Sequence, residues 1–203
     1  MSKQLIGSLD IYMGCMFSGK STELQRYVRR LKTINAKYII INHKIDIRYG
    51  ENVVSTHDKD KIQCISMDKL YDIKKPIYKN LYESSKYIFI EEAQFFKDLY
   101  KFVLEAVNND NKYVIVYGLD GDHEQNLFGD IVKLIPHADN VHKLKSLCKL
   151  CGDGTKALFT IRNLECLKVK DTPQILVGQE DTYMTVCRKH LKEHNIKKKN
   201  LTE

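Results

Sequence analysis

The sequence predicts an α/β protein, in which a parallel sheet carries helices on both faces and a small second lobe follows. Three observations favour this class. Compact apolar runs alternate with segments of helical periodicity over roughly the first two thirds of the chain. A glycine-containing loop separates the first β-prone stretch from the first helical segment. Two pairs of cysteine and histidine residues lie in the last third, where the apolar runs become short.

The elements of the larger part can be placed individually. Strands are expected at residues 8–13, 38–41, 87–90 and 113–118, and helices at 20–33 and 96–107. In the first helix, Leu24, Val28 and Leu31 recur at helical spacing, so one face is apolar. The later strands are short continuous apolar runs, which is typical of parallel strands buried on both faces.

Composition narrows the class of protein. The chain has 203 residues and is 43% hydrophobic, which is enough for a packed core. No apolar run approaches the roughly 18 residues of a membrane span, and the N-terminus lacks a signal-peptide pattern, so we expect a cytoplasmic protein with no membrane partner. The net charge of +7 suits binding of polyphosphates. Without a secretion signal, the six cysteines indicate metal binding before disulfides.

The strongest motif is the loop GCMFSGKS at residues 14–21, which matches G-x-x-x-x-G-K-[ST] between a strand and a helix. Its glycines allow backbone N–H groups to face inward and cradle phosphate oxygens. The N-terminus of the following helix favours the same anion. Lys20 is expected to reach the β- and γ-phosphates of ATP, and the Ser21 hydroxyl to bind Mg²⁺.

Two acidic residues, Glu91 and Glu92, follow the apolar run at 87–90. This pattern resembles a Walker B segment, which supplies a carboxylate for the metal beside a phosphate-binding loop. A kinase also needs a carboxylate that accepts the proton of the attacking hydroxyl. We therefore assign Glu91 to the metal and Glu92 to the base. Taken alone, the pair would be read as an exposed acidic turn.

The last third contains two pairs of metal-ligand residues. Cys148 and Cys151 are separated by two residues, as are Cys187 and His190. Two such pairs suit a tetrahedral Zn²⁺ site, and four protein ligands leave no open position for catalysis. The sequence therefore predicts structural zinc that holds together a lobe too small to bury much core.

In this order, the loop, the acidic strand end and the ligand pairs resemble the thymidine kinase family, in its zinc-containing P-loop form from cells and large DNA viruses. The resemblance runs from about Leu9 to His190. It rests on MFSGKSTEL at 16–24, DIRY at 46–49, THD at 56–58, EEAQFF at 91–96, LDGDHEQNLFG at 119–129 and YMTVCRKH at 183–190.

The resemblance implies a P-loop NTPase-like fold with a zinc-ribbon-like lobe. It also implies transfer of the γ-phosphoryl of ATP to the 5′-hydroxyl of thymidine, giving dTMP. The expected ATP and Mg²⁺ side comprises Gly14, Met16, Phe17, Ser18, Gly19, Lys20, Ser21, Thr22, Asp46, Arg48, Glu91 and Gln94. The expected thymidine side comprises Met16, Phe95, Leu119, Phe128, Leu176, Val177, Gly178 and Tyr183. Glu92 corresponds to the catalytic base. Family membership further implies a homotetramer and feedback inhibition by dTTP.

Several positions depart from the family pattern. Cys15 stands where Pro is frequent, Glu91 where Asp is usual, and Ala93 where Gly is common. His123 replaces an aromatic residue near the nucleoside, and Gln179 replaces a second Gly in the loop that closes over it. His123 is the departure most able to alter affinity.

Other interpretations stay open at this point. A kinase for deoxyuridine or deoxycytidine would share the same motifs. The positive charge and a basic C-terminal segment would also suit a nucleic-acid-dependent ATPase with a zinc ribbon, although we expect no nucleic-acid partner. A structural zinc protein with a degenerate nucleotide site is a third interpretation. Phe95 and Phe96 could each be ordinary core residues.

The same patterns divide the chain. We expect a P-loop domain over residues 1–145, and a zinc lobe that carries the nucleoside-closing loop over 146–191. A basic, disordered tail is expected over 192–203, because that segment has little apolar surface to bury.

Overall fold

The computed structural model describes residues 6–46, 53–55, 61–163 and 182–202. A parallel sheet of six strands has the order β5-β2-β6-β7-β1-β8. The strands are β1 (Ser8–Gly14), β2 (Tyr38–His43), β5 (Ile65–Met67), β6 (Tyr87–Ile90), β7 (Tyr113–Gly118) and β8 (Asn140–Leu144). The predicted parallel sheet is therefore confirmed. All four predicted strands belong to it, and β7 lies between the strands that end in the phosphate loop and the acidic pair.

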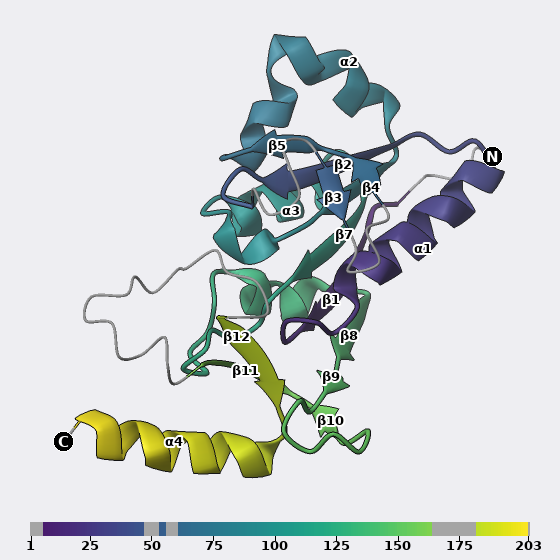
Figure 1. Cartoon of the computed structure of the whole chain (residues 1–203). Coiled ribbons are helices and arrows are strands. Elements are labelled where there is room, and N and C mark those ends of the chain that lie inside the picture. Colours follow the sequence, from purple (N-terminus) through teal and green to yellow (C-terminus); the bar gives the residue numbers. More distant parts are fainter. Residues whose placement is uncertain (1–5, 47–52, 56–60, 164–181, 203) are drawn as a thin grey trace.

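Helices cover both faces of the sheet (Figure 1). One face packs against α1 (Lys20–Thr33) through Leu24, Val28 and Leu31. The other packs against α3 (Leu99–Asn108), with η1 (Leu70–Lys74), α2 (Pro76–Ser84) and η3 (Ile131–His137) beside it. Consecutive residues of a strand point to opposite faces, so one set of strands supplies both cores.

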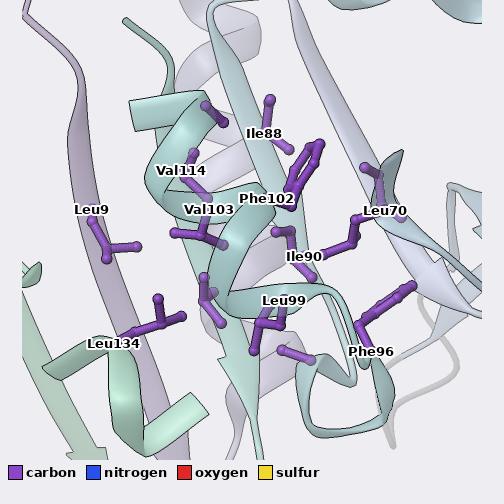
Figure 2. Close-up of a cluster of buried hydrophobic side chains, with 14 of the residues drawn as sticks. Leu9, Leu70, Ile88, Ile90, Phe96, Leu99, Phe102, Val103, Val114 and Leu134 are labelled. Atoms are coloured by element: carbon purple, nitrogen blue, oxygen red, sulfur yellow. The ribbon is translucent and has the colours of Figure 1, made fainter. Parts of the chain in front are cut away.

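The larger core lies under α3 (Figure 2). Phe102, Val103 and Leu99 of this helix are fully buried against Ile88 and Val114 of the sheet. Fully burying a side chain of this size contributes about 1.5–3 kcal/mol. Truncating Phe102 to Ala would cost about 3–5 kcal/mol because it also leaves a cavity.

Helix α1 has the predicted bounds, whereas α3 begins later than predicted. The expected helix at 96–107 starts only at Leu99, and residues 93–95 form a separate short helix, η2 (Ala93–Phe95). Phe96 then takes an extended backbone, which separates η2 from α3. Its side chain is 1% exposed, so it belongs to the core.

The remaining elements are small. β3 (Val53–Ser55) and β4 (Lys61–Gln63) form an antiparallel pair. The second lobe contains two antiparallel pairs, β9 (Ser146–Leu147) with β10 (Lys156–Ala157) and β11 (Phe159–Arg162) with β12 (Tyr183–Val186). Its small core is formed around Ala157, Ile161 and Val186.

The last helix, α4, corrects one expectation. Instead of a disordered tail after residue 191, α4 (Arg188–Thr202) continues to Thr202. The helix has little apolar surface, as expected, and Leu191 is the side chain that it buries in the core of the lobe. The helix also makes polar contacts, such as the ion pair between Lys198 and Glu124, which apolar patterns in the sequence do not reveal. No helix in the described part of the chain is long and apolar enough to cross a membrane.

Candidate active site

The phosphate loop connects the C-terminal end of β1 to α1. Gly19 is the N-cap of α1 and has φ 83°, a left-handed conformation that glycine adopts without strain. The Ser18 hydroxyl is buried and has no hydrogen-bond partner among the described residues. Lys20 folds back over the loop, and its Nζ donates a hydrogen bond to the Cys15 carbonyl at 2.9 Å. A buried, unsatisfied hydroxyl beside a lysine and a helix N-terminus is suited to binding phosphate.

Glu91 reaches the phosphate loop from the end of β6. Ser21 donates a hydrogen bond to its Oε1, and its Oε2 has no partner among the described residues. Burial, with the neighbouring charge of Glu92 adding to it, raises the pKa of Glu91 to about 7. A buried carboxylate and a hydroxyl whose oxygens converge are the ligand types that Mg²⁺ prefers.

Glu92 lies where the chain leaves the sheet. Its backbone is left-handed, with φ 51° and ψ 40°, which turns the chain sharply after Glu91. Such a conformation is uncommon outside glycine and is concentrated at functional sites. The Glu92 carboxylate accepts a hydrogen bond from Gln94 Nε2 at 2.6 Å. The turn therefore gives the two adjacent glutamates different surroundings.

Gln94 links Glu92 to the end of β7. Its Oε1 accepts a hydrogen bond from the Leu119 amide at 2.9 Å, while its Nε2 donates to Glu92. Gly118 makes this possible, because a Cβ at that position would lie 2.7 Å from Gln94 Oε1. Gln94, which was predicted on the ATP side, contacts both the Glu92 carboxylate and the Leu119 amide in this structure.

Aromatic side chains gather beside this carboxylate. The Phe95 and Phe128 rings meet edge to face at 5.4 Å, and both residues are half-buried. The His43 ring also lies near Phe95, with 5.7 Å between the ring centroids. Phe95 is thus less buried than the core residue Phe96, and an apolar surface is available next to Glu92. Such a surface is typical of sites that hold a planar base.

The loop 119–129 carries Phe128 and is internally fixed. Gly121 and Leu127 form an antiparallel bridge, and Asp122 Oδ1 accepts hydrogen bonds from the amides of Glu124 and Asn126. Asp122 is 8% exposed, so the loop is built around a buried carboxylate.

His123 of this loop faces the second lobe. Its ring lies edge-on to Tyr183 of β12, at 6.3 Å between ring centroids. The Tyr183 hydroxyl accepts a hydrogen bond from Arg162 at 3.3 Å. Burial, with the nearby Arg162 charge adding to it, lowers the pKa of His123. The imidazole is therefore neutral at pH 7.

The second lobe also contacts the phosphate loop directly. The Met16 amide donates a hydrogen bond to Thr160 Oγ1 at 2.9 Å, and the Cys15 thiol contacts the Ala157 carbonyl at 3.6 Å. The amide of Met16 is therefore used to hold the lobe in place. Sequence reasoning missed Thr160 and Arg162, because neither lies in a local pattern that marks it as part of a site.

The four predicted metal ligands come together in the second lobe. Their ligand atoms all lie within 4.8 Å of one another. His190 Nδ1 is 3.4, 3.4 and 3.5 Å from the sulfurs of Cys148, Cys151 and Cys187, and the last two sulfurs are 3.8 Å apart. A tetrahedral Zn²⁺ with ordinary bond lengths requires separations of about 3.5–3.8 Å. The residues therefore fit zinc.

The structure describes some of the remaining predicted site residues but not others. Asp46 lies near the end of β2, where it accepts a hydrogen bond from Asn42 at 3.2 Å. Thr22 is exposed on the first turn of α1. Four predicted residues lie outside the described part of the chain, namely Arg48, Leu176, Val177 and Gly178.

Comparisons of the sequence with protein families and with individual proteins identify the same family. A sequence model of a protein family, described as thymidine kinase, matches residues 7–191. A thymidine kinase of Oryza sativa subsp. japonica is 39% identical over 191 residues, which cover 94% of this chain and 68% of that protein. One from Sheeppox virus is 37% identical over 183 residues, covering 90% and 96% of the two chains. The cytosolic thymidine kinase of Gallus gallus is 35% identical over 185 residues, covering 90% and 75%.

Proposed function

Because the chain belongs to the thymidine kinase family and catalyses ATP-dependent phosphorylation of thymidine, we propose that Glu92 is the general base of that reaction. The observation that supports this role is the hydrogen bond from Gln94, which fixes the Glu92 carboxylate beside Phe95. From that position Glu92 would accept the proton of the 5′-hydroxyl as the hydroxyl attacks the γ-phosphorus.

The phosphate loop would position the donor. The buried Ser18 hydroxyl and the amides at the start of α1 would bind phosphate oxygens. Lys20 would exchange its contact with the Cys15 carbonyl for the β- and γ-phosphates. Phe17, Thr22, Asp46 and Arg48 complete the proposed ATP side of the site.

The Ser21 hydroxyl and Glu91 would hold Mg²⁺, and Glu91 would be ionised when it does so. Bound Mg²⁺ would neutralise charge that develops on the transferred phosphoryl group. Burial raises the pKa of Glu91, so a bound cation would stabilise the ionised form of this carboxyl group.

Thymidine would lie against the apolar surface formed by Phe95 and Phe128, with Leu119 and the Met16 side chain beside it. Tyr183 would approach from the second lobe. We propose Leu176 to Gly178 as the segment whose backbone groups bind the pyrimidine edge. A site that pairs with the polar edge of one base discriminates strongly, because another base leaves buried groups unpaired.

The Cys148, Cys151, Cys187 and His190 cluster would hold a structural Zn²⁺. The metal would supply most of the stability of a lobe with few buried residues. Through Thr160, that lobe also holds Met16 of the phosphate loop. We further propose a homotetramer inhibited by dTTP, and, by analogy with the named cytosolic relative of Gallus gallus, a cytoplasmic location.

The test is a substrate survey with purified, zinc-replete protein. Mg-ATP is supplied with each common deoxynucleoside in turn, and monophosphate formation is measured. We expect rapid turnover of thymidine and little with deoxycytidine or the purine nucleosides. Preferred turnover of another nucleoside would contradict the assigned base-binding residues. ATP hydrolysis stimulated by DNA, without nucleoside turnover, would contradict the kinase assignment itself.

A further inference from the structure

Three residues of α4 define one face of this helix, which we call the α4 face: His190, His194 and Lys198. They are spaced by four residues, which places their side chains in a row along a helix. Each contacts a different part of the protein. His190 belongs to the predicted zinc cluster, whereas His194 and Lys198 reach residues near the nucleoside side of the site. Figure 1 shows α4 running beside β11 and β12.

His194 contacts the end of β11. Its Nε2 lies 3.0 Å from the Arg162 carbonyl oxygen, and since a carbonyl only accepts, this nitrogen is the donor. Arg162 is 2% exposed, and its guanidinium group donates a hydrogen bond to the Tyr183 hydroxyl. The second turn of α4 thus holds the backbone of the residue that orients Tyr183.

Lys198 contacts the loop 119–129. Its Nζ forms an ion pair with Glu124, which lies 74 residues earlier in the chain. The hydrogen bond from Lys198 lowers the pKa of Glu124. Glu124 follows His123 directly, and its amide is bound by the buried Asp122 carboxylate. A displacement of Glu124 would therefore be transmitted to the ring of His123.

We propose that His194 and Lys198 are positioning residues for nucleoside binding. By holding Arg162 and Glu124, the α4 face fixes the relative positions of Tyr183 and His123, whose rings are in contact. His194 anchors β11, which pairs with β12 at Arg162 and Tyr183. Lys198 anchors the loop that carries His123. The inference rests on the proposed thymidine site, but it concerns affinity for the nucleoside and assigns no chemical step to α4.

The direct test is Lys198→Glu, which places a negative charge opposite Glu124. Exposed ion pairs are weakly stabilising, and a like-charge pair is destabilising to a similar extent. We therefore expect the KM for thymidine to rise about two- to fivefold. The KM for ATP and kcat should stay within error of wild type. Thymidine affinity measured by calorimetry without ATP should fall by the same factor.

Two further variants distinguish a loss of the contact with Glu124 from a general effect of the change in net charge. Lys197→Glu makes the same change in net charge at an exposed residue about 100° around the helix, and it should leave thymidine affinity unchanged. The exchange Lys198→Glu with Glu124→Lys restores opposite charges and should return affinity toward wild type. Zinc content is measured for every variant and should not change.

The outcomes are distinct. Equal loss of thymidine affinity in Lys198→Glu and Lys197→Glu would overturn the proposal, as would failure of the charge exchange to restore it. A fall in kcat with no change in thymidine affinity would also overturn it. A wild-type protein that phosphorylates no nucleoside would instead overturn the proposed substrate site, and this inference with it.

Discussion

The Ser21 hydroxyl donates a hydrogen bond to the Glu91 carboxylate, which lies 70 residues further along the chain. The contact spans β7, because β1 and β6 are not neighbours in the sheet. Both groups are oxygen ligands of the kind that Mg²⁺ binds. The pair therefore defines where the phosphate loop and the acidic strand end would share one cation.

Replacing Ser21 by Ala should raise the Mg²⁺ concentration needed for half-maximal activity. The variant loses one proposed ligand but keeps Glu91. Ser21→Thr retains a hydroxyl and serves as the matched control. Activity is measured at fixed ATP over a range of free Mg²⁺. An unchanged Mg²⁺ dependence in the Ala variant would exclude Ser21 as a ligand.

Glu92→Gln should lower kcat about 10²- to 10⁴-fold, which is the usual contribution of a general base. The amide keeps the shape of the side chain but accepts no proton, so ATP affinity should be nearly unchanged. Single-turnover phosphorylation and nucleotide binding are measured in parallel. Glu83→Gln, on an exposed side chain of α2, is the control. If the Glu92→Gln variant turned over at the wild-type rate, Glu92 would not be the general base.

Cys151→Ser should lower the zinc content of the purified protein well below one ion per chain. It should also make the second lobe sensitive to protease, because the core around Ile161 is small. Metal content is measured by mass spectrometry. Cys64→Ser, at a buried cysteine outside the cluster, should keep its zinc. Loss of zinc from both variants would point to general unfolding instead.

Lys112→Met should destabilise the fold by about 1–3 kcal/mol. Lys112 is 7% exposed, and its Nζ donates hydrogen bonds to the carbonyls of Tyr82, Glu83 and Ser85 at the end of α2. Methionine preserves much of the volume but leaves these buried acceptors without a donor. Urea denaturation measures the effect, with Lys79→Met on the exposed face of α2 as control. If Lys112→Met lowered the free energy of unfolding no more than Lys79→Met, the hydrogen bonds from Lys112 would not stabilise the fold.

Asp110→Asn should reduce stability at neutral pH by about 1–2 kcal/mol, and by less in acid. Burial opposes ionisation of Asp110, but hydrogen bonds from Lys74 and Tyr82 outweigh it, so its pKa is lowered. In the unfolded chain this carboxyl group binds a proton more readily. The contribution to stability is therefore present above the ordinary pKa of 3.8 and is lost as pH falls below it.

The measurement is urea denaturation of wild type and Asp110→Asn, from pH 7 down to the lowest pH at which both fold. The difference in the free energy of unfolding should shrink as pH falls. Asp130→Asn, which removes an ion pair with the exposed Lys133, should show only a small difference. If the difference in the free energy of unfolding for Asp110→Asn grew as pH fell, it would contradict a lowered pKa for Asp110 in the folded protein.

Local sequence patterns predicted much of the main domain. The buried strands were visible as continuous apolar runs, and α1 as a periodic segment that follows a glycine. The same approach missed β8, whose side chains are largely exposed at the edge of the sheet. It also missed the helical structure of α4, because polar contacts such as that between Lys198 and Glu124 leave no apolar pattern in the sequence.

In the candidate site, too, some residues could be predicted from the sequence and others could not. Lys20, Ser21 and the four predicted zinc ligands belong to short motifs whose spacing predicts their chemistry. Thr160 and Arg162 could not be identified from spacing, because their importance comes from contacts with Met16 and Tyr183 across the fold. The contacts that Gln94 makes with Glu92 and Leu119 could not be predicted either, since they require the absence of a side chain at Gly118.

The position of β1 in the sheet determines when the main domain can fold during synthesis. Ser8 pairs with Tyr113 on one side, and Asp10 pairs with Asn140 on the other. The strand that leads into the phosphate loop is therefore translated early but gains its neighbours only after most of the main domain has been synthesised. Parallel pairing over such distances forms slowly. A nascent chain that has not reached residue 113 would expose an unpaired β1, so we expect such chains to need chaperones and to bind no ATP.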